Sequence, residues 1–143
     1  MIEPLVPYNI LNSLDKYDRI VVGGIIKVDD INDKVLFLKR SQHEFMPNVW
    51  EIPSGGIEEG ESMLQALKRE IKEETNLDIL DVEKFVSAVD YLAGEAKCLQ
   101  LNFNVRCSGN VKLSDEHSEF IFSRLDTFLS NLDEFMLKII TLG

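Results

Sequence analysis

The chain has no long apolar run and only two cysteines among its 143 residues. A membrane-spanning helix needs about 18 consecutive apolar residues, and no segment approaches that length. Residues 1–10 lack both the basic region and the long apolar region of a secretory signal. Cys98 and Cys107 lie on one extended segment, at opposite faces and roughly 30 Å apart, which excludes a disulfide between them. We therefore expect free thiols, a cytoplasmic location and no membrane association.

Basic residues are also scarce. Fifteen Lys and Arg residues stand against 25 Asp and Glu residues, so the net charge is −10. Such a surface repels phosphate groups, which argues against binding to duplex nucleic acid. A phosphorylated ligand would need a cation between itself and the protein. With 45% apolar residues, the composition is that of an ordinary globular domain.

The apolar patterns predict one α/β domain with a mixed sheet and helices on both sides. Residues 1–17 are expected to be an N-terminal extension with a short helix over 10–15, and residues 18–143 the domain. Strands are predicted over 19–28 and 34–40, as a hairpin through the polar turn 29–33, and over 49–52, 80–91, 97–107 and 119–123. Helices are predicted over 62–76 and through the apolar positions 128–139 near the end.

The helix predicted over 62–76 carries clustered acids. Glu70, Glu73 and Glu74 stand at i, i+3 and i+4, so their carboxylates share one face. Glu74 falls within the apolar stripe, whereas a solvated charged face would keep acids out of it. Arg69 is expected to flank only Glu73, so the carboxylates repel one another. A hard divalent cation removes that cost, and the cluster therefore indicates a metal site.

A glycine-rich loop precedes this helix, and together they form a motif. Residues 55–77 resemble the Nudix box, G-x5-E-x7-R-E-U-x-E-E-x-G-U, where U is aliphatic. The matching positions are Gly55, Glu61, Arg69, Glu70, Ile71, Glu73, Glu74 and Leu77. Asn76 replaces the last glycine, and asparagine tolerates the left-handed conformation that ends a helix. The fixed positions would match by chance with a probability on the order of 10⁻⁵.

The resemblance implies a Nudix-like α/β/α sandwich and a set of site roles. Glu70, Glu73, Glu74 and the Ser54 carbonyl would bind Mg²⁺, for which Mn²⁺ can substitute. Gly55, Glu61 and Arg69 would support the site. Glu70 and Glu116 would be catalytic, with Glu119 competing for the place of Glu116.

The implied activity is Mg²⁺-dependent hydrolysis of a nucleoside diphosphate linked to another moiety, most simply a canonical or oxidised nucleoside triphosphate or a small nucleotide derivative. Arg40 and Phe45 are candidates for binding this substrate. His43 and His117 are interpreted as loop residues, because they are not spaced as zinc ligands. The oligomeric state is left open, with a homodimer as one option.

Two other functions compete with this interpretation. The chain could be a non-catalytic nucleotide-binding or regulatory module of the Nudix fold, although such modules usually lose box glutamates. It could instead be an acidic interaction domain without a metal, in which the motif is a coincidence. Metal titration separates the last option from the others, and product release separates hydrolysis from binding alone.

Overall fold

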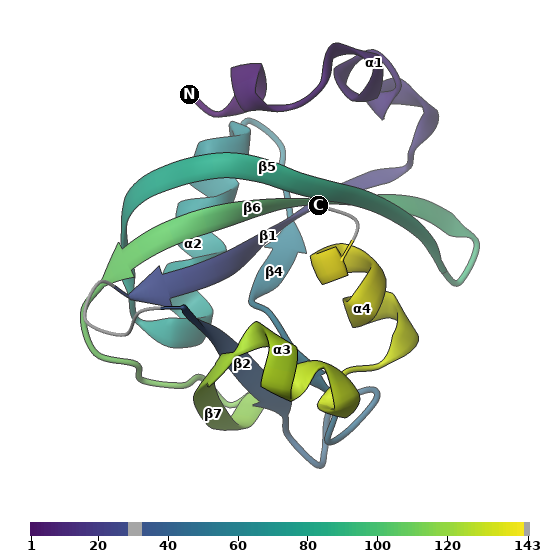
Figure 1. The fold of residues 1–143 in the computed structure, drawn as a ribbon. Helices are drawn as coiled ribbons and strands as arrows, with labels where there is room; N and C mark the ends of the chain where they lie inside the picture. The colour runs from purple at the N-terminus through teal and green to yellow at the C-terminus, as the bar shows by residue number, and fades with distance from the viewer. Residues whose placement is uncertain (29–32, 142–143) are drawn as a thin grey trace.

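A computed structural model of the chain describes residues 1–28 and 33–141 (Figure 1). The strands are β1 (Arg19–Val28), β2 (Lys34–Arg40), β3 (Trp50–Glu51), β4 (Ser54–Gly56), β5 (Asp78–Ala93), β6 (Ala96–Ser108) and β7 (His117–Arg124). The α-helices are α1 (Tyr8–Leu11), α2 (Met63–Thr75), α3 (Leu125–Phe128) and α4 (Glu134–Thr141), and 3₁₀ turns cover Glu3–Leu5, Leu14–Lys16 and Leu129–Asn131. None of the helices in these ranges is long and apolar enough to cross a membrane.

The strands form two sheets. The larger has the order β4-β1-β6-β5, in which β1 and β6 are parallel and the other pairs antiparallel. The smaller is antiparallel, with the order β3-β2-β7. The predicted hairpin of residues 19–28 and 34–40 is wrong, because β1 pairs on both sides within the larger sheet while β2 belongs to the smaller one. Residues 29–32 of its predicted turn lie outside the described part of the chain.

Helices cover both faces of the larger sheet, which confirms the predicted α/β/α arrangement (Figure 1). On one face, Leu67 and Ile71 of α2 pack with Val22, Leu101 and Phe103 in one core cluster. A second cluster joins the sheet to the C-terminal helices, with buried members including Ile25, Val89, Phe128, Leu132, Met136 and Ile139. Cys98 and Cys107 are buried and free, as expected.

The C-terminal helix predicted through residues 128–139 is interrupted. Leu132 follows the 3₁₀ turn in an extended conformation, with φ −98° and ψ 144°, and α4 begins only at Glu134. Of the apolar positions expected to face the core, Phe128, Leu132, Met136 and Ile139 are nevertheless buried, and Leu129 and Phe135 are partly buried. The interruption therefore changes the path of the chain without exposing that apolar face.

Both ends of α2 are fixed by capping. Ser62 accepts a hydrogen bond from the Gln65 amide, and the Gln65 side chain accepts one from the Ser62 amide, which forms a capping box. At the other end, Asn76 has φ 67°, the left-handed conformation expected where the motif usually has glycine. These caps set the axial position of the helix, and with it the positions of its glutamates.

The N-terminal residues contribute to the main core. The side chains of Ile2 and Val6 are each 4% exposed and belong to the same cluster as Val22 and Leu67. Ile10, Leu14 and other partly buried side chains pack against that cluster. Residues 1–17 thus cover the fold as a strap, and the domain boundary at residue 18 stays a prediction.

Candidate metal and catalytic site

The acidic cluster of α2 lies beside β4. Glu74 is buried at 4% exposure, Glu70 is half-buried, and Glu73 points to solvent with 59% of its side chain exposed. The Ser54 amide donates a hydrogen bond to Glu74 Oε2 at 3.2 Å. In an antiparallel strand the N–H and C=O of one residue point to the same side. We therefore expect the Ser54 carbonyl to lie on the side of the glutamates, and its role as a ligand stays a prediction.

Gly55 is the point of closest approach between β4 and α2. A Cβ atom built on this residue would overlap the carboxyl group of Glu70. A side chain at this position would therefore push the carboxyl group of Glu70 away from the strand. The motif glycine thus has a packing reason that involves a predicted metal ligand directly.

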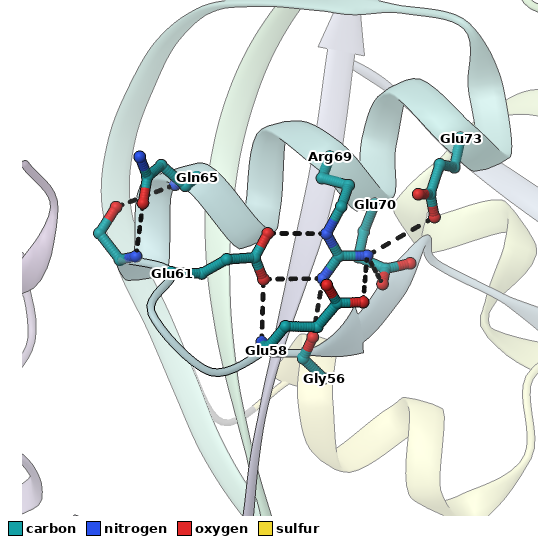
Figure 2. Close-up of polar contacts among 8 residues, drawn as sticks. Gly56, Glu58, Glu61, Gln65, Arg69, Glu70 and Glu73 are labelled. Carbon is teal, nitrogen blue, oxygen red and sulfur yellow. Dashed lines mark hydrogen bonds and ion pairs between the residues drawn. The ribbon is translucent and has the colours of Figure 1, made fainter.

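Arg69 lies at the centre of an ion-pair network (Figure 2). Its guanidinium contacts Glu61 at 2.7 Å, Glu70 at 2.6 Å, Glu73 at 3.6 Å and Glu58 at 3.7 Å. The expectation that Arg69 flanks only Glu73 is wrong. A prediction from helical spacing alone takes no account of the length of the arginine side chain. It also takes no account of the loop that brings Glu58 and Glu61 close to the helix.

This network fixes the loop between β4 and α2. Arg69 makes two hydrogen bonds to Glu61 and a further one, at 3.0 Å, to the Gly56 carbonyl. The bond from Arg69, together with a backbone bond from Glu58, lowers the pKa of Glu61 to about 2. Glu61 is therefore ionised throughout the neutral range. The contacts tie the loop to the helix through Arg69 and Glu61, and the supporting role of both residues in a site stays a prediction.

Burial and like charge act together on Glu74. Loss of solvation, the largest cause, and the neighbouring charges of Glu70, Glu116 and Glu51 together raise the pKa of this carboxyl to about 10. Burial also raises the pKa of Glu70, although Arg69 opposes that shift. Without a bound cation, the site holds protons that it would have to release on binding one.

Two residues of this cluster were missed by sequence reasoning. His117 was interpreted as a loop residue, but it begins β7 and its side chain is fully buried. Its Nε2 lies 2.8 Å from Glu51 Oε2, and its Nδ1 lies 3.9 Å from Glu74 Oε1. Glu51, Glu74 and His117 together could hold a metal ion. The only sequence signal was the position of His117 next to Glu116, because its partners are far away along the chain.

Glu116 and Glu119 have different surroundings. Glu116 lies in the turn before β7, where its backbone carbonyl accepts a hydrogen bond from the Ser41 amide, and its charge acts on Glu74. Glu119 is 60% exposed and pairs with Lys39 at 3.2 Å. Of these two acids, only Glu116 contributes to the raised pKa of Glu74, and the catalytic role of either stays a prediction.

Arg40 and Phe45, the predicted substrate-binding residues, are linked to each other. Arg40 Nε donates a hydrogen bond to the Phe45 carbonyl at 2.6 Å, and its Nη1 contacts Glu51 at 3.1 Å. The Phe45 side chain is 82% exposed. The structure thus places Arg40 beside the cluster, bound to protein groups, and leaves the Phe45 ring open to solvent. Their binding role stays a prediction.

A mixed sheet between helices, with a glycine-rich strand facing an acidic helix, defines the class of fold and site. The chain belongs to the NUDIX domain family, whose model matches residues 18–141. Membership of this family rules out the alternative in which the motif arose by chance in an unrelated interaction domain.

Relatives and solved structures agree with this assignment. The chain is 34% identical over 82 residues to an 8-oxo-dGTP diphosphatase of Buchnera aphidicola, covering 57% of this chain and 59% of that protein. It is 45% identical over 60 residues to an RNA pyrophosphohydrolase of Legionella pneumophila, covering 42% and 31%. The MutT protein of Methanosarcina mazei has a similar structure, with a TM-score of 0.72, 26% identity, and 82% and 86% of the two chains covered. The chain thus spans less than two thirds of the length of the Buchnera and Legionella relatives.

Proposed function

We propose that this chain is a divalent-metal-dependent pyrophosphohydrolase that acts on a nucleoside diphosphate linked to another moiety. One observation carries the proposal: the buried Glu74 carboxyl faces further carboxyls, while the nearby guanidinium groups of Arg69 and Arg40 are already bound to glutamates. A cation from solution would replace the proton of Glu74 and, at the same time, attract a phosphorylated substrate to an acidic protein.

The donor set fits Mg²⁺, with Mn²⁺ as a substitute. Glu70, Glu73, Glu74 and the Ser54 carbonyl offer oxygen ligands, which hard divalent cations prefer. The bound ion would neutralise phosphate charge and lower the pKa of water. Gly55 lets the strand approach closely enough for Ser54 and Glu70 to serve one site.

A carboxylate would accept the proton of the attacking water. Glu70 and Glu116 are the two candidates, and we favour Glu116 because it is exposed while acting electrostatically on Glu74. Glu70 is instead engaged by Arg69 at 2.6 Å. Arg69 and Glu61 would act as positioning residues, since they hold the loop and the metal ligands in place.

The substrate we propose is a canonical or oxidised nucleoside triphosphate or a small nucleotide derivative. Relatives named as an 8-oxo-dGTP diphosphatase and an RNA pyrophosphohydrolase support a nucleotide-derived substrate. The exposed Phe45 ring is available to stack on a base, with Arg40 nearby. A cytoplasmic location accords with the free cysteines, and a homodimer is an option that oligomeric-state measurement would test.

A substrate panel tests this function. Canonical and oxidised nucleoside triphosphates, dinucleotides and ADP-ribose would be incubated with the chain and Mg²⁺, and released phosphate or pyrophosphate measured. We expect turnover of at least one class, loss of turnover after chelation, recovery with Mg²⁺ or Mn²⁺, and poor recovery with Ca²⁺. Binding of Mg²⁺ and nucleotide without turnover across the panel would instead support the regulatory module. Full turnover after exhaustive chelation would refute the metal site.

A further inference from the structure

We propose that β7 is the surface through which two copies of this chain associate. In the proposed dimer, residues 118–124 of one copy pair antiparallel with residues 118–124 of the other, about a two-fold axis at Ile121. The two three-stranded sheets would then form one continuous sheet. The contact is independent of the catalytic activity proposed above, because none of these residues is assigned to the metal site.

The outer strands of the two sheets differ in how they are protected against pairing with another chain. Strands β3 and β4 have two and three residues, which is too short to present a long edge. Strand β5 is long, but its pairing with β6 shifts register at three places, and such irregularities discourage further pairing. Strand β7 has neither protection, because six consecutive residues, 119–124, pair with β2 in unbroken register. It is therefore the open edge of the described fold.

The side chains of β7 are open to solvent on both faces of the smaller sheet. Phe120 is 44% exposed and Ile121 is 39% exposed, and neighbours on a strand point to opposite faces. Their directly opposite partners on β2, Leu38 and Phe37, are fully buried. In the described part of the chain β7 pairs with β2 alone, so backbone groups on its other side point away from the sheet. Unpaired backbone groups beside exposed apolar side chains suit the addition of a further strand.

The sequence of β7 favours a second copy as that strand. Phe120 and Phe122 lie symmetrically about Ile121. A two-fold contact uses the same residues on both sides, so Ile121 would lie opposite its counterpart and Phe120 opposite Phe122 of the second copy. The rings of Phe120 and Phe122 already meet edge to face, with centroids 6.3 Å apart. Pairing would bring four such rings together on one face of the joined sheet.

The charges beside β7 permit this contact in a chain of net charge −10. Glu119 pairs with Lys39 at 3.2 Å, and Arg124 pairs with Asp126 at 3.2 Å. In the two-fold register, Glu119 and Arg124 would each lie opposite a serine of the second copy. Like charges therefore do not face one another across the contact, and the acidic surface elsewhere does not prevent association at this edge.

A contact along one strand is small, so the dimer should be weak. Stable interfaces bury about 1,200–2,000 Å² in total, and we expect this edge to bury less and to give a dissociation constant on the order of 10 µM. Each copy has one such edge and the two-fold contact closes on itself, so assembly should stop at the dimer. Analytical ultracentrifugation over a range of protein concentrations measures both properties.

Charge substitutions at the two-fold axis test the register. Ile121→Lys and Ile121→Glu each place like charges directly opposite one another, and we expect each to weaken the dimer at least about tenfold. An equimolar mixture of the two variants should recover the dimer, because lysine then faces glutamate. Leu80→Lys is the matched control, since Leu80 is 49% exposed on the outer strand β5. This control should associate like the wild-type protein.

Several results would overturn the proposal. These are a wild-type chain that stays monomeric up to about 1 mM, equal weakening by Leu80→Lys, or a mixture that does not recover the dimer. If the Ile121 variants fail to fold, amide hydrogen exchange of the wild-type protein decides the outcome. The amides of residues 118–124 should exchange more slowly at high protein concentration than at low, and unchanged exchange would contradict the contact. A failure of the substrate panel leaves each of these measurements intact.

Discussion

The metal-free protein should become more stable when Glu74 is replaced by glutamine. The folded pKa of Glu74, about 10, lies above its ordinary value of 4.5. A carboxyl with a raised folded pKa contributes stability below pH 4.5 that is lost as the pH rises toward 10. Glu74→Gln does not ionise, and it keeps an oxygen for the Ser54 amide. Its amide can also donate toward the His117 Nδ1 lone pair.

The magnitude follows from the pKa difference. At pH about 7.5, Glu74 is still protonated in the folded chain, roughly three pH units above its unfolded pKa. At about 1.36 kcal/mol per unit, keeping this proton costs up to about 4 kcal/mol of stability. For a domain of this size, about 1 kcal/mol corresponds to a few degrees of melting temperature, so we expect a rise of roughly 10 °C in EDTA. The difference between variant and wild type should shrink as the pH falls toward 5.

The same substitution should impair the proposed reaction. We expect the rate at saturating Mg²⁺ to fall by about two or more orders of magnitude, as on removal of a transition-state electrostatic contact. The stabilisation by Mg²⁺ should also shrink, because one ligand charge is lost. Glu83→Gln, on the exposed part of β5, makes the same charge change away from the site and should alter neither property. A Glu74→Gln variant with wild-type rate and an unchanged or lower metal-free melting temperature would refute this reasoning.

Other substitutions test the supporting parts of the site. Gly55→Ala should displace Glu70 and lower the rate at least about tenfold, whereas Gly94→Ala, in an open turn with φ 63°, should cost only about 1 kcal/mol of stability, measured by denaturant unfolding. Arg69→Lys should lower both kcat and thermal stability, because lysine lacks the planar fork that binds Glu61. A variant as active as the wild-type protein would contradict this role of Arg69. Ile2→Ala should lower the free energy of unfolding by about 2–4 kcal/mol without changing KM. An unchanged free energy of unfolding, measured with urea, would show that residues 1–17 are not part of the core.

Local patterns predicted the helical half of the site well. The spacing of Glu70 and Glu74 against the apolar stripe already required one acid to be buried, and Glu74 is 4% exposed. Asn76 was correctly predicted as the helix terminator, since its side chain tolerates the conformation it adopts. These features depend on residues within one helix, where geometry follows directly from sequence separation.

Pairing between distant segments was not predictable in the same way. Strands β1 and β2 are adjacent in sequence and were assigned to one hairpin, but each finds its partners elsewhere in the chain. His117 and Glu51 lie 66 positions apart and meet only because β3 and β7 flank β2 in the smaller sheet. No periodicity within either segment carries that information, so the buried imidazole was misassigned to a loop.

The distribution of cations bears on how this acidic protein would bind the charged substrate proposed above. In many phosphate sites an arginine contacts the ligand directly, but here Arg69 is bound on several sides by Glu58, Glu61, Glu70 and Glu73. Its charge therefore holds the loop and orients Glu70 rather than attracting phosphate. Arg40 is likewise engaged by Glu51. Under the proposed function, the negative charge of the substrate would then be met mainly by ions from solution, and the affinity for substrate would depend on the metal concentration before any chemistry begins.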